Sequence, residues 1–276
     1  MSKNKVEEAP ALFVIGTAGS GKTSLTSSIV DWLIRKGINA EAINLDPGVE
    51  FLPYEPLIDA RDYVDVYEIM RTEGLGPNSA LILSIDLLVD HIDEMRKIFN
   101  ESTADLFVVD TPGQIELFAF RSGGLVLAEE LFRGNKAIAY LVDAAFSSEP
   151  MNFISNLFLE AAVYSRFLLP TITVVTKEDL VSEEKIKKIF KWFTNKETII
   201  DDVRRIYDAE KYLYVKNAVK SIPSLGFLEK PIITSSKTLE GIIDLYASIS
   251  RIFFRGEETK DGPPSYRVLT EMLLFR

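Results

Sequence analysis

The stretch at residues 16–23, Gly-Thr-Ala-Gly-Ser-Gly-Lys-Thr, constrains this chain more than any other feature. An apolar run at residues 11–15 precedes it and predicts a buried strand, and the apolar side chains of residues 24–36 recur after it at helical spacing. In that context, glycines let successive backbone N–H groups point at phosphate oxygens, and the helix N-terminus adds its positive end. A glycine-rich turn that only caps a helix is the alternative, but the filled motif positions and both flanks favour a phosphate loop. The stretch therefore predicts a P-loop that binds a nucleoside triphosphate.

The residue types in this loop match what a triphosphate and its metal require. Lys22 can reach the β- and γ-phosphates, and the Thr23 hydroxyl can ligate Mg²⁺. The residues that we expect to contact the phosphates are Gly16, Ala18, Gly19, Ser20, Gly21, Lys22, Thr23 and Ser24.

Composition narrows the class of protein and of partner. The chain has 276 residues, of which 47% are hydrophobic, enough for one large domain or a domain with an embedded subdomain. Its 41 acidic and 31 basic residues give a formal net charge of -10 without a basic cluster, so we expect no nucleic-acid partner. Cysteine is absent, and the single histidine, His91, has no cysteine or second histidine to join it as a metal ligand. No apolar run reaches membrane-spanning length and the first ten residues are polar, so we expect a cytoplasmic protein without membrane contact.

Two further predicted strands end in aspartates, at the sheet edge where ligands bind in open α/β folds. The strand at residues 40–45 is followed by Asp46, and the strand at residues 104–109 is followed by Asp110. We expect both carboxylates near Mg²⁺ or the γ-phosphate, which makes Thr23, Asp46 and Asp110 the candidate metal ligands. A simple turn before Pro-Gly remains the alternative for Asp46.

The segment after Asp110 carries the groups that a hydrolase needs beside the γ-phosphate. The Gly113 N–H can contact the phosphate, and Gln114 can orient the attacking water. Spacing does not decide which residue acts as the general base. The candidate catalytic residues in these motifs are Lys22, Asp46, Asp110 and Gln114.

A third motif, at the end of the predicted strand of residues 171–175, is expected to recognise the nucleotide base. Thr176-Lys177-Glu178-Asp179 resembles the Asn/Thr-Lys-x-Asp motif of guanine-specific enzymes. The Asp179 carboxylate can accept both the N1–H and the exocyclic amine of guanine, whereas adenine offers neither donor. Ser235, after a predicted strand at residues 231–234, is placed to meet the base through backbone N–H groups. A polar loop leading into the next helix is the alternative reading.

The segments between these motifs are predicted as loops and helices. Two prolines make residues 51–57 a loop, and Asn78 stands where it could cap a helix at residues 79–100. Residues 183–222 form a charged helical insertion, in which we expect the stripe at residues 212–215 to be core.

Taken together, the motifs resemble the GPN-loop GTPases. They run in family order from residue 11 to about residue 255: the P-loop, Asp46-Pro-Gly, Tyr54-Glu-Pro, Gly76-Pro77-Asn78, the segment at residues 110–116, and Thr176-Lys-Glu-Asp-Leu. The resemblance implies a homodimeric GTPase with GTP/GDP and Mg²⁺, in which Gly76, Pro77 and Asn78 reach across to the partner's phosphates. It also implies that Asp46, Asp110 and Gln114 help to hold the attacking water, and it makes Asn78 a further candidate catalytic residue. In eukaryotic members the implied role is assembly or import of RNA polymerase.

The predicted fold is therefore α/β, a doubly wound, mostly parallel P-loop NTPase sheet with an inserted helical subdomain. We expect the GTPase domain to span residues 1–256, with the GPN loop at residues 74–79, and a C-terminal tail at residues 257–276.

Two rival functions stay open. One is a dimeric MinD-like ATPase, against which Thr17 stands where that class carries lysine. The other is a nucleotide-gated protein-binding module with little intrinsic hydrolysis.

Overall fold

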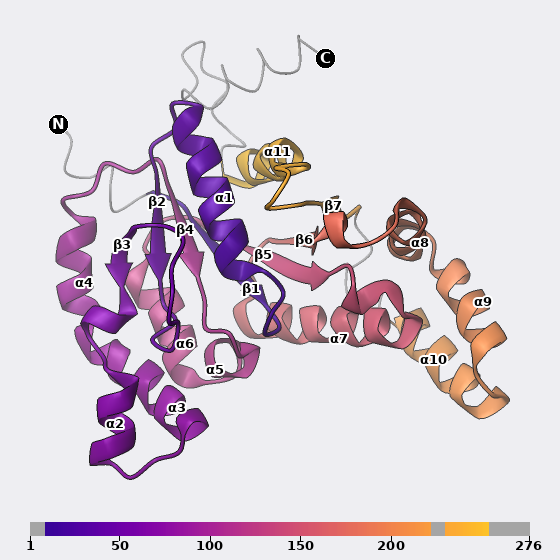
Figure 1. Ribbon diagram of the computed structural model, residues 1–276, viewed down its shortest axis with the longest axis horizontal. Helices are drawn as coiled ribbons and strands as arrows, with labels where there is room; N and C mark the ends of the chain where they lie inside the picture. The colour runs from indigo at the N-terminus through magenta and orange to yellow at the C-terminus, as the bar shows by residue number, and fades with distance from the viewer. Residues whose placement is uncertain (1–8, 222–229, 254–276) are drawn as a thin grey trace.

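A computed structural model describes residues 9–221 and 230–253 of the chain, and its centre is one parallel sheet (Figure 1). The strand order is β3-β2-β4-β1-β5-β6-β7, and every pair of neighbours runs parallel. The strands are β1 (Ala11–Gly16), β2 (Ala40–Asn44), β3 (Pro56–Asp59), β4 (Leu106–Asp110), β5 (Lys136–Asp143), β6 (Thr171–Thr176) and β7 (Ile232–Ile233). The predicted parallel α/β architecture is confirmed.

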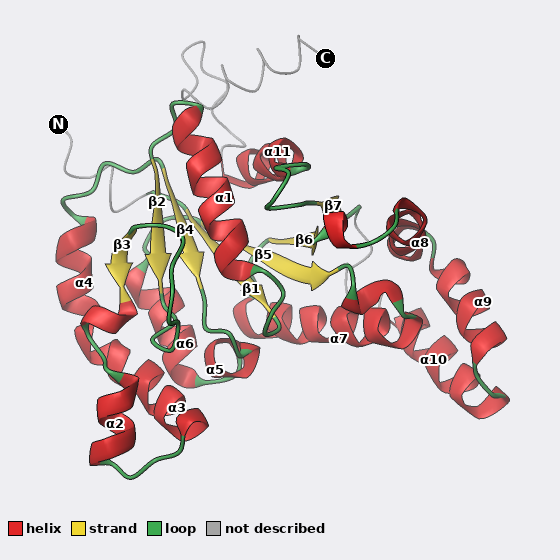
Figure 2. Cartoon of the chain, viewed as in Figure 1, coloured by secondary structure: helices red, strands yellow, loops and turns green. Residues whose placement is uncertain are grey.

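Helices cover both faces of this sheet, which makes it doubly wound (Figure 2). On one face, α1 (Lys22–Arg35) and α11 (Ile242–Phe253) pack over Leu12, Val14 and Ala139. The other face buries Phe13 and Tyr140 beneath the remaining helices of the domain. Neighbouring residues of β1 and β5 thus enter opposite cores, because successive side chains of a strand alternate between faces.

Helical segments of the second face connect the central strands. They are η1 (Ala60–Asp62), α2 (Val66–Thr72), α3 (Pro77–Leu88), η2 (Val89–His91), α4 (Ile92–Phe99), α5 (Ile115–Ala119), α6 (Ser122–Val126), η3 (Leu127–Leu131), η4 (Phe146–Ser148) and α7 (Pro150–Phe167). Within the described residues, no helix is both long enough and apolar enough to cross a bilayer.

The inserted helical subdomain lies between β6 and β7, as predicted. After η5 (Glu178–Leu180) it consists of α8 (Glu183–Thr194), α9 (Lys196–Ile206) and α10 (Ala209–Ser221), which extend away from the sheet in Figure 1. The expectation of a buried stripe at residues 212–215 is only half right. Val215 is buried, but Leu213 and Tyr214 are 56% and 72% exposed.

Three details of the secondary structure differ from the sequence prediction. A seventh strand, β3, begins inside the expected loop of residues 51–57; Pro56 is its first residue and sits on the edge of the sheet, where a missing N–H is tolerated. The helix expected at residues 79–100 starts at Pro77 and is divided by η2. Helix α5, at Ile115–Ala119 directly after the segment that follows Asp110, was not predicted. The predicted tail at residues 257–276 lies outside the described residues.

Candidate nucleotide site

The predicted P-loop connects β1 to α1 at the carboxyl edge of the central strand. Gly19 and Gly21 have φ of 74° and 95°, the left-handed region that glycine adopts without steric cost. Gly21 is the N-cap of α1 and supplies no side chain, and no side-chain cap bonds the first N–H groups of the helix. A helix end of this kind offers its free N–H groups and its positive dipole end to an anion.

Lys22 is buried at the bottom of this loop. Its ammonium donates to the carbonyl oxygens of Gly16 at 2.9 Å, Thr17 at 3.1 Å and Gly113 at 3.1 Å. Burial lowers the pKa of Lys22, and the charges of Asp110 and Asp46 act in the opposite direction. Carbonyl dipoles therefore stabilise the charge of this lysine. No ion pair within the described residues neutralises it.

Asp46 joins the loop after β2 to the loop after β4. Its Oδ1 accepts the N–H of Gly48 at 2.9 Å, and its Oδ2 accepts the N–H of Gly113 at 2.9 Å. Burial raises the pKa of this carboxyl, and the two backbone N–H groups lower it. The turn interpretation of Asp46 is thus incomplete, because the side chain also reaches a segment 67 positions further along the chain.

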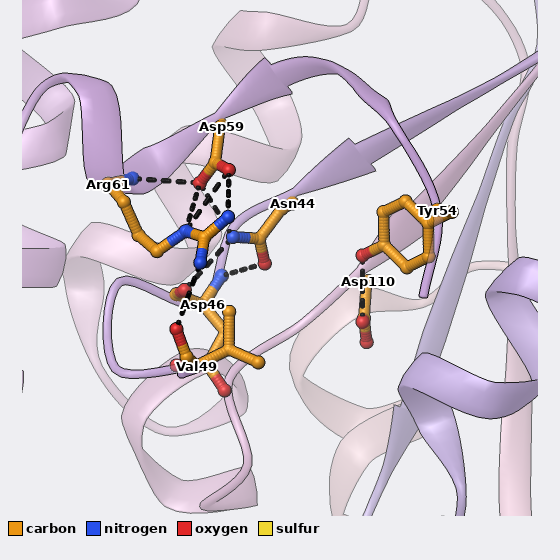
Figure 3. Close-up of polar contacts among 7 residues, drawn as sticks. All are labelled: Asn44, Asp46, Val49, Tyr54, Asp59, Arg61 and Asp110. Carbon is orange, nitrogen blue, oxygen red and sulfur yellow. Dashed lines mark hydrogen bonds and ion pairs between the residues drawn. The ribbon is translucent and has the colours of Figure 1, made fainter. Parts of the chain in front are cut away.

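Asp110 ends β4 and is almost fully buried, with 1% of its surface exposed. Tyr54 donates its hydroxyl to Asp110 Oδ2 at 2.9 Å (Figure 3). Burial raises the pKa of Asp110 to about 6, while the hydroxyls of Thr23 and Tyr54 lower it. Its Oδ1 is buried without a hydrogen-bond partner in the described residues. A carboxylate oxygen with spare acceptor capacity beside a threonine hydroxyl suits the hard oxygen ligation of Mg²⁺, so these residues fit the metal.

A network that the sequence did not reveal supports the Asp46 loop (Figure 3). The Asn44 amide accepts the N–H of Asp46 at 3.0 Å and donates to Asp59 Oδ1 at 2.8 Å. Arg61 binds Asp59 at 2.6 Å and donates to the carbonyl of Val49 at 3.3 Å. Burial raises the pKa of Asp59, but the hydrogen bonds from Arg61 and Asn44 outweigh it and leave the pKa below its ordinary value. Only the fold could reveal these contacts, because β3 itself was not predicted.

The predicted base motif lies beside the P-loop. Thr176 Oγ1 donates to the carbonyl of Ser20 at 2.8 Å, and Lys177 pairs with Asp143 at 2.6 Å. Ser235 is buried, and its hydroxyl donates to Asp179 Oδ1 at 2.8 Å. We predicted a role for Ser235 through its backbone N–H, whereas the structure shows its side chain orienting Asp179.

These residues border a cavity of about 410 Å³ that opens next to the start of α1. It is lined by Gly21, Ser24, Ser27, Ser28, Pro53, Thr176, Lys177, Asp179, Leu180, Ser236 and Lys237. Ser24 therefore lines the base side of the site. A cavity between a P-loop and an acceptor carboxylate can hold a base and its ribose.

The Gly-Pro-Asn loop lies near the segment after Asp110. Gly76 is the N-cap of α3 and Pro77 its first residue, so the idea that Asn78 caps the helix is wrong. The Asn78 side chain is exposed, and its Oδ1 accepts the Gln114 amide at 3.3 Å. The structure thus brings together two candidate catalytic residues. Ala18 and Gly19, at the tip of the P-loop, are also exposed.

Comparisons with known proteins agree with this arrangement. The family model described as "Conserved hypothetical ATP binding protein" matches residues 14–254. The chain is 39% identical over 181 residues to GPN-loop GTPase PAB0955 of Pyrococcus abyssi, which covers 65% of this chain and 71% of that protein. It is 34% identical over 195 residues to GPN-loop GTPase 1 of Schizosaccharomyces pombe, covering 70% of this chain and 52% of the relative. Against several curated relatives, the match therefore spans about half of their length.

A solved structure shows the same fold. The apo crystal structure of PAB0955, described as a GTPase from Pyrococcus abyssi, superimposes with a TM-score of 0.78 at 32% sequence identity. The superposition covers 91% of this chain and 99% of the other.

Proposed function

The chain belongs to the GPN-loop GTPase family, and on that premise we propose that it binds GTP with Mg²⁺ and hydrolyses it to GDP and phosphate. One observation carries the proposal. The P-loop with its buried Lys22, the two strand-end carboxylates and the cavity beside Asp179 lie contiguously along one edge of the sheet. A triphosphate and its base span such a length of edge.

The phosphate end of the site supplies charge and orientation. Lys22 would move from carbonyl oxygens to phosphate oxygens, where its charge stabilises the transition state. Thr23, Asp46 and Asp110 would hold Mg²⁺, which neutralises charge that develops on the transferred phosphoryl group. Gln114, whose amide donates to Asn78 Oδ1, would orient the attacking water. Which residue takes the proton of that water stays open.

The base end supports guanine as the substrate base. Asp179 presents a carboxylate whose Oδ1 is fixed by the Ser235 hydroxyl. The Lys177 ammonium pairs with Asp143 and also donates to the carbonyl of Gly19 in the P-loop. Guanine offers its N1–H and its exocyclic amine to this carboxylate. Adenine offers neither donor, so the carboxylate would be left unpaired against it. The carboxylate at this position favours GTP over ATP, the nucleotide that the family model's description names.

We further propose that the active form is a homodimer in which residues 76–78 also act across the interface. The exposed Asn78 side chain, free of any capping role, supports this. By resemblance, the switch would serve assembly of a protein complex, RNA polymerase in eukaryotic members. A cytoplasmic location without nucleic-acid or membrane partners stays a prediction.

Phosphate release from GTP, and separately from ATP, tests the proposal when it is measured with Mg²⁺ over a range of protein concentrations. We expect GTP-selective turnover whose specific activity rises with concentration, because a dimer completes the site. Turnover of ATP alone would refute guanine recognition. Tight GTP binding without turnover would favour the nucleotide-gated binding module.

A further inference from the structure

Tyr54 makes a contact to which neither the sequence motifs nor the proposed function assigns a role. Its hydroxyl donates to Oδ2 of the buried Asp110 at 2.9 Å, across 56 positions of sequence (Figure 3). It comes from the loop that precedes the edge strand β3, whereas Asp110 ends the interior strand β4.

The loop that carries Tyr54 is anchored along the nucleotide site. Ser27, in α1, donates its hydroxyl to the carbonyl of Pro53 at 3.3 Å, and Pro53 itself lines the base cavity. The Tyr54 ring packs against the core on the α1 side of the sheet, and β3 begins two residues later. The hydroxyl is therefore delivered by a segment fixed on both sides, and its direction is set by packing.

The kind of donor matters as much as its place. An arginine or lysine paired with Asp110 would fix the carboxylate but would also neutralise it and compete with a cation. A phenol hydroxyl donates one hydrogen bond and carries no charge at neutral pH. It can therefore restrict the orientation of the carboxylate without neutralising the negative charge of Asp110. Asp110 forms no ion pair with any described residue, so this charge remains unneutralised.

We propose that Tyr54 is a positioning residue, whose hydroxyl holds Asp110 in the orientation in which the carboxylate serves the Mg²⁺–phosphate end of the site. This inference rests on the proposed function, and it adds a residue that the P-loop, the Asp110 segment and the base motif do not include. Tyr54 touches neither the base nor the phosphates by this account; it acts through Asp110.

The variant Tyr54→Phe tests the inference because it removes the hydroxyl and keeps the ring. Loss of one hydrogen bond to a charged group corresponds to a change of about 10-fold. We expect the Mg²⁺ concentration needed for half-maximal tightening of GDP binding to rise about 10-fold, with kcat for GTP falling and KM little changed. GDP affinity in EDTA should stay within about 2-fold of the wild type. Tyr67→Phe, at a 71% exposed tyrosine on α2, is the matched control and should change none of these values.

A double-mutant cycle separates positioning from general damage. If Tyr54 acts through Asp110, adding Tyr54→Phe to Asp110→Asn should have little further effect on Mg²⁺ dependence. Additive losses would overturn the inference, as would an unchanged Mg²⁺ dependence in Tyr54→Phe alone. A wild type that binds GDP with Mg²⁺ but releases no phosphate from GTP would refute the proposed hydrolysis only. Binding that does not depend on Mg²⁺ would overturn the role of Tyr54 together with the metal assignment.

Discussion

Four aspartates stand at or just beyond the carboxyl ends of β3, β2, β4 and β5, and they fall into an inner and an outer pair. The inner pair, Asp46 and Asp110, is held by uncharged donors: two backbone N–H groups for the first and the Tyr54 hydroxyl for the second. The outer pair is neutralised, Asp59 by Arg61 and Asp143 by Lys177, each at 2.6 Å. Unneutralised negative charge is therefore found at the inner pair. This pair lies beside the P-loop, where a cation would accompany a triphosphate.

The two pairs also differ in their energetic consequences. Burial raises the pKa of Asp46 and Asp110, so the folded state disfavours their charged forms. In Asp59 the hydrogen bonds from Arg61 outweigh burial, and the pKa falls. Ionised Asp59 thus stabilises the fold, whereas ionised Asp46 and Asp110 lower its stability at the place where a cation would bind.

Lys22→Ala gives the largest expected effect on the inner region. The charge of the lysine acts on both inner carboxylates, and no described ion pair uses it. We expect GTP affinity, measured by calorimetric titration, to fall by about 100-fold or more, because several charge-assisted hydrogen bonds are lost. Lys36→Ala, at the exposed end of α1, is the control. Unchanged GTP affinity in Lys22→Ala would refute the P-loop assignment.

Asp179→Ala probes the base end, where charge should affect selectivity and not metal binding. Removing the acceptor should reduce the preference for GTP over ATP by about 30-fold, since only guanine offers two donors to it. The Mg²⁺ dependence of GDP binding should stay as in the wild type. Competition binding with both nucleotides measures this, with the exposed Asp244→Ala as control. If discrimination survives, guanine recognition by residues 176–179 is wrong.

Asp59→Asn probes the outer pair and acts on stability. Asp59 has a lowered pKa in the folded state, so it adds stability above its unfolded value near 3.8 and loses it as pH falls through the folded value. We expect the unfolding free energy at pH 7 to fall by about 2 kcal/mol, because the substitution leaves Arg61 partly unpaired. The difference from the wild type should narrow below about pH 4. Chemical denaturation at several pH values would show a constant difference if the ion pair were irrelevant.

Most of the fold could be predicted because its signals are local. The P-loop, the apolar strands around it and the aspartates that end them are each written in a few consecutive residues, and the structure confirms their order. The edge strand β3 was missed because Pro56 suggests a loop, although an edge strand can begin with proline. Asn78 was offered as a possible cap because its amide suits that role, but Pro77 already begins the helix.

The supporting contacts of the site could not be predicted. The Tyr54–Asp110 and Asn44–Asp59 bonds join segments that meet only after the sheet has formed. Ser235 was singled out by its place after a strand, but the partner of its hydroxyl depends on where η5 places Asp179. Patterns of residue type locate the strand ends, whereas side-chain partners across them depend on the register of the sheet.

The most direct test of the inner pair is the unfolding free energy of Asp110→Asn against the wild type at pH 7.5, in EDTA and with Mg²⁺ and GDP. A pKa raised to about 6 means that ionised Asp110 costs the fold stability above that pH, on the order of 2 to 3 kcal/mol, and costs none well below pH 4. We therefore expect Asp110→Asn to be the more stable protein in EDTA, and the wild type to recover the difference when Mg²⁺ and GDP are added. If Asp110→Asn is less stable than the wild type in EDTA, or if Mg²⁺ and GDP stabilise both equally, Asp110 is a structural residue and the account is contradicted.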